Sequence, residues 1–381
     1  MSTSNVSIAG TGIHPFGRFE NRTVTDMGVA AVADALAAAG DPPFQAAFCG
    51  TAYAGVAAGH KVLGALGLTG VPIVDVEAGC ASGGAALMLA AGAIRAGQYD
   101  CVLVFGIEKM PKGIIRSSFF EPWREEAGLA STPAYFALRA QRLMREAGVT
   151  KEQLAEVVVK NRRHGVHNPD AMFRREVTVD EVLASRIVCE PLHLWMLCSP
   201  NEGAAAVVLR AATASERDAV VLRAAALRSH LPGSVLDEGT PLAGITDDDD
   251  IPAPTTLAAR AAYEEAGVDP ADVDVVECQD TDAARELLSL EELGLVPPGD
   301  AGKWVAAGAT GLGGRLPVNA SGGLLSKGEP LGASALGQVV ELASQLRGEA
   351  GARQVDGART GLAHTVGRGA NASVAILQRN R

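Results

Sequence analysis

The sequence predicts an α/β protein in which a mainly parallel sheet is covered by helices on both faces. Short apolar runs alternate with Ala-rich amphipathic runs along most of the chain, as in proteins whose strands alternate with helices. Hydrophobic residues make up 48% of the chain but aromatic residues only 4%, so small side chains must form much of the core and let helices approach the sheet closely. A chain of 381 residues is long enough for several domains or one large duplicated unit.

The first hundred or so residues predict a regular series of strands and helices. Thr25 is a possible N-cap of the first helix, and Thr69-Gly-Val-Pro72 is expected to end the second. We expect strands at 6–12, 44–53, 72–76 and 101–106, and helices at 23–39, 60–68 and 80–97.

Residues 109–200 interrupt this series with polar helices, one of them predicted over 141–162, and we interpret the stretch as an insertion that covers one end of the sheet. A strand at 201–209 then completes the first series. The second series is expected to contain strands at 219–222, 273–278, 361–363 and 372–377, a helix at 255–267 and another after Gly332. Two comparable series indicate an internal duplication, with an N-terminal half at 1–215 and a C-terminal half at 216–381.

Charge and composition exclude several classes of function. The net charge of −11 argues against nucleic acid or an anionic membrane surface as the main partner. No apolar run is long enough for membrane insertion, and the first residues lack a signal-peptide pattern, so a cytoplasmic location is expected. No metal site is expected either, because no Cys-x-x-Cys pair is present and the aspartate run 247–250 is typical of a solvated loop.

Cys80 gives the clearest chemical signal in the sequence. A buried strand ending at Val76 leads through Glu77-Ala-Gly79 into Cys80, and a helix rich in Ala and Gly follows. The thiol is therefore expected at the N-terminus of a helix, where partial positive charge and unpaired N–H groups favour the nucleophilic thiolate and can stabilise an oxyanion. The alternative is a core cysteine packed at a tight turn.

The segment 67–87 around this cysteine resembles the nucleophile region of thiolases. It is most similar to the sterol carrier protein X type, also called lipid-transfer-protein thiolases. The similarity continues in order along nearly the whole chain, through the stretches 101–110, 160–169, 180–185, 198–206, 286–294, 319–323, 328–334 and 361–369.

The resemblance implies a thiolase fold, in which duplicated βαβαβαββ halves form a five-layered αβαβα arrangement with a loop domain inserted at 109–200. It implies a homodimer, a coenzyme A thioester as substrate and no bound cofactor. It assigns the acyl-accepting role to Cys80 and thioester binding to Ser321, Gly322 and Gly367. Many proteins of this branch work with a small zinc-ribbon and OB-fold partner. This chain has no zinc-ribbon cysteines, so a separate protein would have to supply that domain.

The sequence departs from the family pattern at its acid/base positions. Glu329 replaces the histidine of a Gly-His-Pro motif, and Gln279 and Thr281 replace the histidine and cysteine of a His-Asp-Cys-Phe motif. Glu329 is the candidate base, and Gln279 can hold a water or a carbonyl by hydrogen bonds. Thr281 cannot supply a proton at neutral pH as a thiol can. Asp282 is a further candidate carboxylate, with a surface or capping role as the alternative.

Other histidines and cysteines are candidates to replace the lost groups. His364 precedes the closing strand, where it either replaces a lost imidazole or has a structural role. His164 and His167 are expected to order the neighbouring Asn168-Pro169 rather than contact substrate. Cys198 is expected to pack beneath a run of small residues.

Three functions follow from these residues. The first is an acyl-CoA C-acyltransferase that works through an acyl-cysteine with a non-standard acid/base set. The second is a retro-aldolase that cleaves a hydroxylated, steroid-like acyl-CoA side chain; related lipid-transfer proteins use tyrosines where this chain has Gln279 and Glu329. The third is a non-catalytic thiolase-like subunit.

Overall fold

The predicted alternation of helices and strands is confirmed in a computed structural model, which describes residues 5–113, 122–127, 131–212, 218–232, 251–367 and 371–380. The strands are β1 (Asn5–Gly17), β2 (Ala46–Gly50), β3 (Ile73–Val76), β4 (Cys101–Lys109), β5 (Ile187–Cys189), β6 (Leu192–His193), β7 (Glu202–Ala212), β8 (Val220–Ser229), β9 (Val275–Glu277), β10 (Thr360–Gly367) and β11 (Asn371–Arg379). The helices are α1 (Val24–Ala38), α2 (Ala58–Leu66), α3 (Ser82–Arg95), α4 (Pro122–Glu126), α5 (Thr132–Ala147), α6 (Lys151–Val166), α7 (Val179–Ala184), α8 (Pro254–Ala266), α9 (Ala283–Glu292), α10 (Ala301–Ala306), α11 (Gly323–Lys327) and α12 (Leu331–Arg347).

The sheet repeats one topology twice. Its strand order is β3-β2-β4-β7-β1-β8-β11-β10-β9, and a parallel bridge between Val276 and Val318 extends the β9 end. In each group the strands at the outer end are parallel, while the last strand of the series runs antiparallel and pairs with the first. Among the described strands, the two groups pair with each other through two residue pairs of β1 and β8, Val6 with Leu222 and Ser7 with Val221. This repeated order supports an internal duplication.

The expectation of a mainly parallel sheet is wrong. Among the described strands of the large sheet, only the pairs β2·β3, β2·β4 and β9·β10 are parallel. The physical reason is the path of the chain, because the last strand of each series returns beside the first in the opposite direction. Composition and periodicity do not reveal that return.

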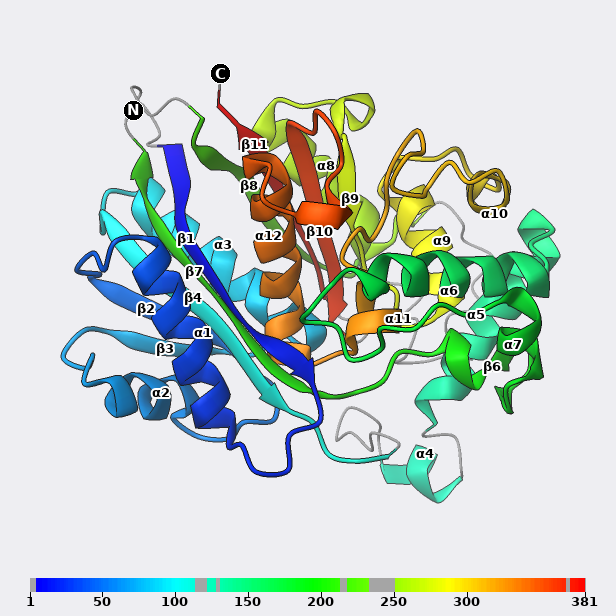
Figure 1. The fold of residues 1–381 in the computed structure, drawn as a ribbon, viewed down its shortest axis with the longest axis horizontal. Coiled ribbons are helices and arrows are strands. Elements are labelled where there is room, and N and C mark those ends of the chain that lie inside the picture. The colour runs from blue at the N-terminus through cyan, green and yellow to red at the C-terminus, as the bar shows by residue number, and fades with distance from the viewer. Residues whose placement is uncertain are drawn as a thin grey trace.

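The predicted layered arrangement is confirmed. Figure 1 shows the layers from left to right: α1 and α2, the strands β1, β7 and β4, the central helices α3 and α12, the strands β10 and β11, and then α9; helix α8 overlaps β10 and β11 in this view. The central helices contact strands of both groups, whereas α1 and α8 each contact strands of one group. Helix α12 and the parts of α3 that face the two groups of strands are therefore buried, which explains their small and apolar residues.

Several element boundaries differ from those predicted for local reasons. Helix α1 is capped by Thr23 rather than Thr25, since Thr23 and Asp26 form a reciprocal capping box. Gly67, with φ of 70°, ends α2 before the predicted stop. The single helix predicted over 141–162 is two helices, α5 and α6, separated by Gly148 in the left-handed region.

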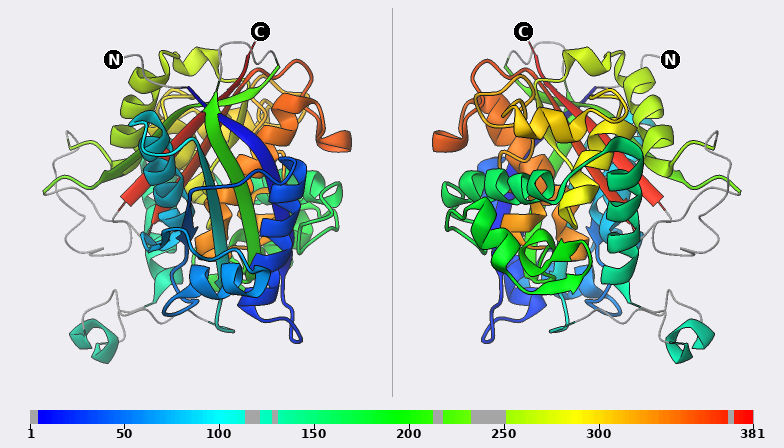
Figure 2. Two further views of the ribbon diagram at one scale, coloured as in Figure 1. Left: turned by 90° about the vertical axis from the view of Figure 1, so that its left-hand side faces the viewer. Right: turned by 90° about the vertical axis from the view of Figure 1, so that its right-hand side faces the viewer.

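The inserted stretch packs mainly on the later helices. Helices α5 and α6 contact α9, α10 and α11, and they share one apolar core with the strands β9 to β11. The right-hand view of Figure 2 shows these inserted helices in front of the rest of the molecule. The predicted boundary at 215/216 and the aspartate run 247–250 lie outside the described residues. Within the described part of the chain, no helix is long and apolar enough to cross a membrane.

Candidate active site

Cys80 lies in a short 3₁₀ turn, Gly79–Ala81, that leads from β3 into the central helix α3. The predicted strand-to-helix turn is therefore confirmed, although Cys80 precedes α3 instead of beginning it. Ser82 holds the turn, since its hydroxyl donates to the Gly79 carbonyl at 2.6 Å and accepts from the Ala78 N–H at 2.9 Å. The Cys80 side chain is buried, with 5% exposed, and packs with Met110 and Leu331.

Glu329 reaches the site through a tightly constrained segment between α11 and α12. Its N–H donates to the Ser199 carbonyl at 2.9 Å, and it forms a bridge with Pro200. Gly328 has a φ of 84°, and a Cβ there would lie 2.0 Å from the side chain of Asn201. Only glycine fits this position, so the Gly-Glu-Pro sequence fixes where the carboxylate lies.

Both carboxylate oxygens of Glu329 accept hydrogen bonds from neighbouring side chains. The Cys198 thiol donates to Oε2 at 3.2 Å, and the Gln279 amide donates to Oε1 at 3.1 Å. The other amide atom of Gln279 accepts from the Val366 N–H at 3.1 Å, which fixes the orientation of the amide. Burial, followed by the charge of Glu329, raises the pKa of the Cys198 thiol well above its ordinary value. Cys198 therefore stays protonated at neutral pH.

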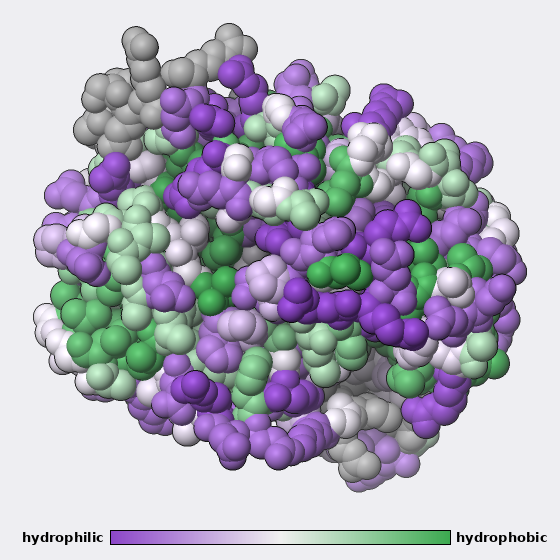
Figure 3. Space-filling view, in the orientation of Figure 1, coloured by the Kyte–Doolittle hydropathy of each residue, from purple (hydrophilic) through white to green (hydrophobic). Residues whose placement is uncertain are grey.

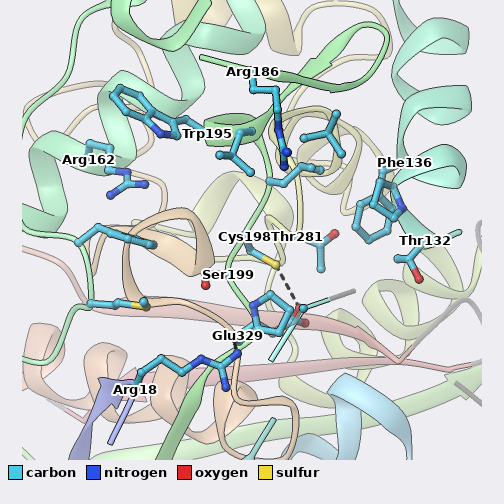
Figure 4. Close-up of a pocket in the computed structure, with 18 of the residues that line it drawn as sticks. Arg18, Thr132, Phe136, Arg162, Arg186, Trp195, Cys198, Ser199, Thr281 and Glu329 are labelled. Atoms are coloured by element: carbon cyan, nitrogen blue, oxygen red, sulfur yellow. Dashed lines mark hydrogen bonds between the residues drawn. The ribbon is translucent and has the colours of Figure 1, made fainter. Parts of the chain in front are cut away.

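Cys80, Cys198 and Glu329 line one cavity of about 750 Å³. Most of the other lining residues belong to the inserted stretch 109–200, including Phe136, Trp195 and a group of arginines. Figure 4 shows the Cys198–Glu329 hydrogen bond at the centre of the cavity wall, with the arginine side chains arranged around it. The volume is in the usual range of small-molecule sites, and the three reactive groups face a common space.

The remaining predicted site residues do not line this cavity. His364 is fully buried on β10, with Nε2 3.0 Å from the Thr255 hydroxyl, and burial lowers the pKa of its imidazole well below the ordinary value. Ser321 donates to Glu277 at 2.5 Å, so its hydroxyl is held inside the protein. Gly322 is the N-cap residue that precedes α11, with φ of 95°.

Gly367 is a separate case, because it approaches the nucleophile turn without lining the cavity. A Cβ at Gly367 would lie 2.0 Å from the Ala78 carbonyl, so the end of β10 lies directly against the turn that carries Cys80. The close approach restricts this position to glycine whether or not it contacts a substrate.

The structure also reveals site residues that the sequence did not single out for function. Cys198 is expected from the sequence to pack beneath small residues, but its N–H donates to the Thr281 carbonyl at 2.8 Å and its thiol contacts Glu329. Cys198 thus lies beside the position where the family pattern has its second cysteine. Glu108 is a second case: it accepts hydrogen bonds from the N–H groups of Ala52 and Gly332, so it links the walls around Cys80. Neither role could be predicted from the sequence, because each depends on a contact between residues far apart in the chain.

His164 and Asp282 have structural roles and do not line the cavity. His164 Nδ1 donates to the Asn319 carbonyl at 3.0 Å from within the core, and burial lowers the pKa of the ring to about 4. Asp282 caps α9 by accepting from the N–H groups of Ala284 and Arg285. In the part of the chain that the structure describes, no three His, Cys, Asp or Glu side chains are grouped as metal ligands.

Comparisons with known proteins agree with this geometry. Residues 6–213 match the family model described as thiolase, N-terminal domain, and residues 244–379 match the model described as thiolase C-terminal domain-like. The chain is 36% identical to the sterol carrier protein 2 of Bos taurus, over 98% of this chain and 72% of the relative. It is also 36% identical to an acetyl-CoA acetyltransferase of Methanothermobacter thermautotrophicus, over 98% of this chain and 100% of the relative. A solved structure called Ltp2-ChsH2(DUF35) aldolase superposes with a TM-score of 0.84 at 25% identity, over 99% of this chain and 98% of that one.

Proposed function

The chain belongs to the thiolase family, and we propose that it transfers acyl groups from coenzyme A thioesters through an acyl-enzyme on Cys80. The observation that carries this proposal is the shared cavity, in which Cys80 faces the same space as a hydrogen-bonded carboxylate and a second thiol. The acyltransferase activity named for the Methanothermobacter relative supports it.

In the proposed reaction, the Cys80 sulfur attacks the thioester carbonyl carbon and the bond from that carbon to the CoA sulfur breaks. The proton of Cys80 passes through Glu329 to the departing CoA thiolate, so CoA leaves as a thiol and the acyl group remains on Cys80. N–H groups at the start of α3 are suited to the transient oxyanion. A carboxylate in place of the family histidine makes proton sharing, rather than a thiolate–cation pair, the basis of activation.

Cys198 supplies the acid that Thr281 cannot provide. Its raised pKa keeps the thiol protonated, and the thiol already donates a hydrogen bond to Glu329, so the two groups form a proton relay beside Cys80. The relay either protonates a leaving carbanion in cleavage or accepts the proton of an attacking carbon acid in condensation. Gln279 holds the carboxylate in position. His364 is left out of this set because its ring is enclosed between β10 and α8.

The experiment is intact-protein mass spectrometry after incubation with acetyl-CoA or acetoacetyl-CoA. The parent protein should gain one acetyl group, Cys80→Ala should gain none, and Cys101→Ala, altered at a cysteine away from the cavity, should behave like the parent. Cys198→Ala should still be acylated but should lose most turnover, roughly a hundredfold. Acylation of another cysteine while Cys80 stays unmodified would overturn the proposal.

Carbon–carbon cleavage without acyl transfer is the second candidate, because the solved structure with TM-score 0.84 carries the name of an aldolase. A retro-aldol reaction breaks the bond beside a hydroxyl-bearing carbon, and the base removes the hydroxyl proton. Incubation with a 3-hydroxyacyl-CoA distinguishes the two: release of a free carbonyl compound from the Cys80→Ala variant would favour the lyase. No reaction and no acylation with either substrate class would favour a non-catalytic subunit.

Two assemblies belong to the proposal. A homodimer would pair the β3 edges of two copies, because β3 is the last strand of the sheet and its Val74 is 42% exposed. A small zinc-ribbon and OB-fold partner protein would complete the assembly, and the second component, ChsH2(DUF35), for which the aldolase structure is named supports a partner protein. Co-purification with the product of a neighbouring gene would test the second assembly.

A further inference from the structure

Arg162 on α6 carries a buried charge that no described residue neutralises. Its side chain has 8% of its surface exposed, and its Nε is buried without a hydrogen-bond partner. Across the described ranges, no carboxylate or carbonyl is bonded to this guanidinium. Burial and the charge of Arg175 lower its pKa to about 10, so it remains charged at neutral pH. A buried charge of this kind normally has a counter-ion.

The guanidinium is held in place and lines the cavity. Its Cζ lies 4.0 Å from the centroid of the Phe173 ring, and both residues line the cavity that contains Cys80 and Glu329. Figure 4 shows Arg162 on the wall of this cavity, on the same side as Trp195. Stacking on Phe173 fixes the plane of the fork, which leaves its N–H groups arranged for two parallel hydrogen bonds to a carboxylate.

We propose that Arg162 binds a carboxylate on the acyl part of the substrate, so that the preferred substrates are CoA thioesters of acids with a second carboxyl group. This inference rests on the proposed function, because it assumes a CoA thioester in this cavity. Glu329 already brings a negative charge to the cavity, so a second anion there needs a cation of its own. Arg18 does not serve, because its guanidinium donates to the Met110 carbonyl at 2.5 Å and pairs with Glu202.

The phosphates of CoA are a less suitable counter-ion for Arg162. They lie at the far end of the pantetheine arm from the thioester, and they are strongly hydrated. Three other lining arginines, Arg174, Arg175 and Arg186, are exposed to solvent and suit such groups. The buried position of Arg162 instead suits a single, planar and less strongly charged group.

The test is calorimetric binding of two unreactive thioethers, S-carboxypropyl-CoA and S-isohexyl-CoA, whose S-substituents have the same shape but differ in charge, the isohexyl group being neutral. The parent protein should bind the carboxylate at least about tenfold more tightly, and Arg162→Met should remove that preference without weakening the binding of S-isohexyl-CoA. Arg162→Lys keeps the charge but loses the fork, so it should retain part of the preference. Arg163→Met is the matched control, since Arg163 is the next residue of α6 and its side chain is exposed.

The outcomes separate this inference from the proposed function. Equal weakening of both thioethers and of free CoA in Arg162→Met would assign Arg162 to a CoA phosphate and overturn the inference, as would a parent protein with no preference. A preference for the carboxylate in a protein whose Cys80 is never acylated would leave the inference standing and refute the acyl-enzyme. Unchanged binding of S-isohexyl-CoA also establishes that the variant is folded.

Discussion

At the scale of single residues, the proposed site combines a cysteine that follows the family pattern with a carboxylate and a second thiol that do not. Glu329 takes the place of a histidine, and the second thiol comes from Cys198 beside Thr281. A carboxylate that accepts two side-chain hydrogen bonds is well oriented, but its negative charge opposes a neighbouring thiolate. The chemistry therefore depends on where one shared proton lies.

Replacing Glu329 by Gln tests this directly. Gln keeps the size of the side chain and one acceptor, but it cannot take a proton, so turnover of the CoA thioester should fall roughly a hundredfold while binding stays nearly unchanged. Steady-state kinetics and calorimetry would measure the two effects. Glu349→Gln, at an exposed position after α12, is the control. Near-parental turnover in Glu329→Gln would remove this carboxylate from the mechanism, whereas thiolysis of acetoacetyl-CoA gained in Glu329→His would show that this substitution changed the chemistry.

His164 should make stability depend on pH. Burial lowers its pKa to about 4, so between its ordinary pKa and that value the unfolded chain binds a proton that the folded chain does not. The contribution of neutral His164 to the free energy of unfolding is complete at neutral pH and is lost as the pH falls toward 4. Urea unfolding at about pH 7 and about pH 4.5 should show a loss in the parent that exceeds the loss in His164→Gln by about 2 kcal/mol. Equal losses would contradict the assignment of a neutral imidazole.

At the scale of elements, the site depends on close contact between β4 and α12. Gly106 on β4 lies against the start of α12, and a Cβ there would be 2.1 Å from the Gly332 carbonyl. Glu108, on the same strand, bonds the Gly332 N–H at 3.1 Å. The strand and the helix thus meet backbone to backbone, which sets the position of Leu331 against Cys80.

Gly106→Ala should therefore destabilise the protein by about 1–3 kcal/mol, because the added methyl group forces the strand and the helix apart. Gly92→Ala is the matched control: Gly92 is an exposed residue inside α3 whose Cβ would meet nothing within 4 Å. It should stabilise slightly, by up to about 1 kcal/mol, through helix propensity. Denaturant unfolding of the two variants would measure both effects, and equal stability would contradict the close contact.

At the scale of the whole molecule, the unpaired edge of the sheet bears on assembly. Figure 3 shows apolar surface gathered where Figure 1 places α2 and β3. An exposed apolar edge strand is a hazard unless another chain covers it, and a second copy would do so symmetrically.

Light scattering should give twice the chain mass for the parent protein, and Val74→Lys on β3 should shift it toward the monomer, because a charge at the paired edge must be desolvated. Val56→Lys is the control, since Val56 is 89% exposed and lies outside β3. A parent that is cleanly monomeric, or a Val74→Lys variant that remains a dimer, would count against pairing through this edge.

The sequence by itself determined the features that are written in neighbouring residues. The order of strands and helices, the turn before α3 that carries Cys80, and the glycine and proline that hold Glu329 all follow from local patterns, because each depends on a few consecutive side chains. The resemblance added the layered fold and the substitution of the acid/base positions.

Only the tertiary structure decided which distant groups meet. Cys198 and Glu329 are 131 residues apart in the chain, and their hydrogen bond exists because a bridge brings Pro200 beside Glu329. His364 faces Thr255 rather than Cys80, because the start of α8 packs against β10. Arg162 on α6 lines the cavity and has no hydrogen-bond partner among the described residues. Periodicity reports which side of an element is buried, but it carries no information about which other element will cover that side.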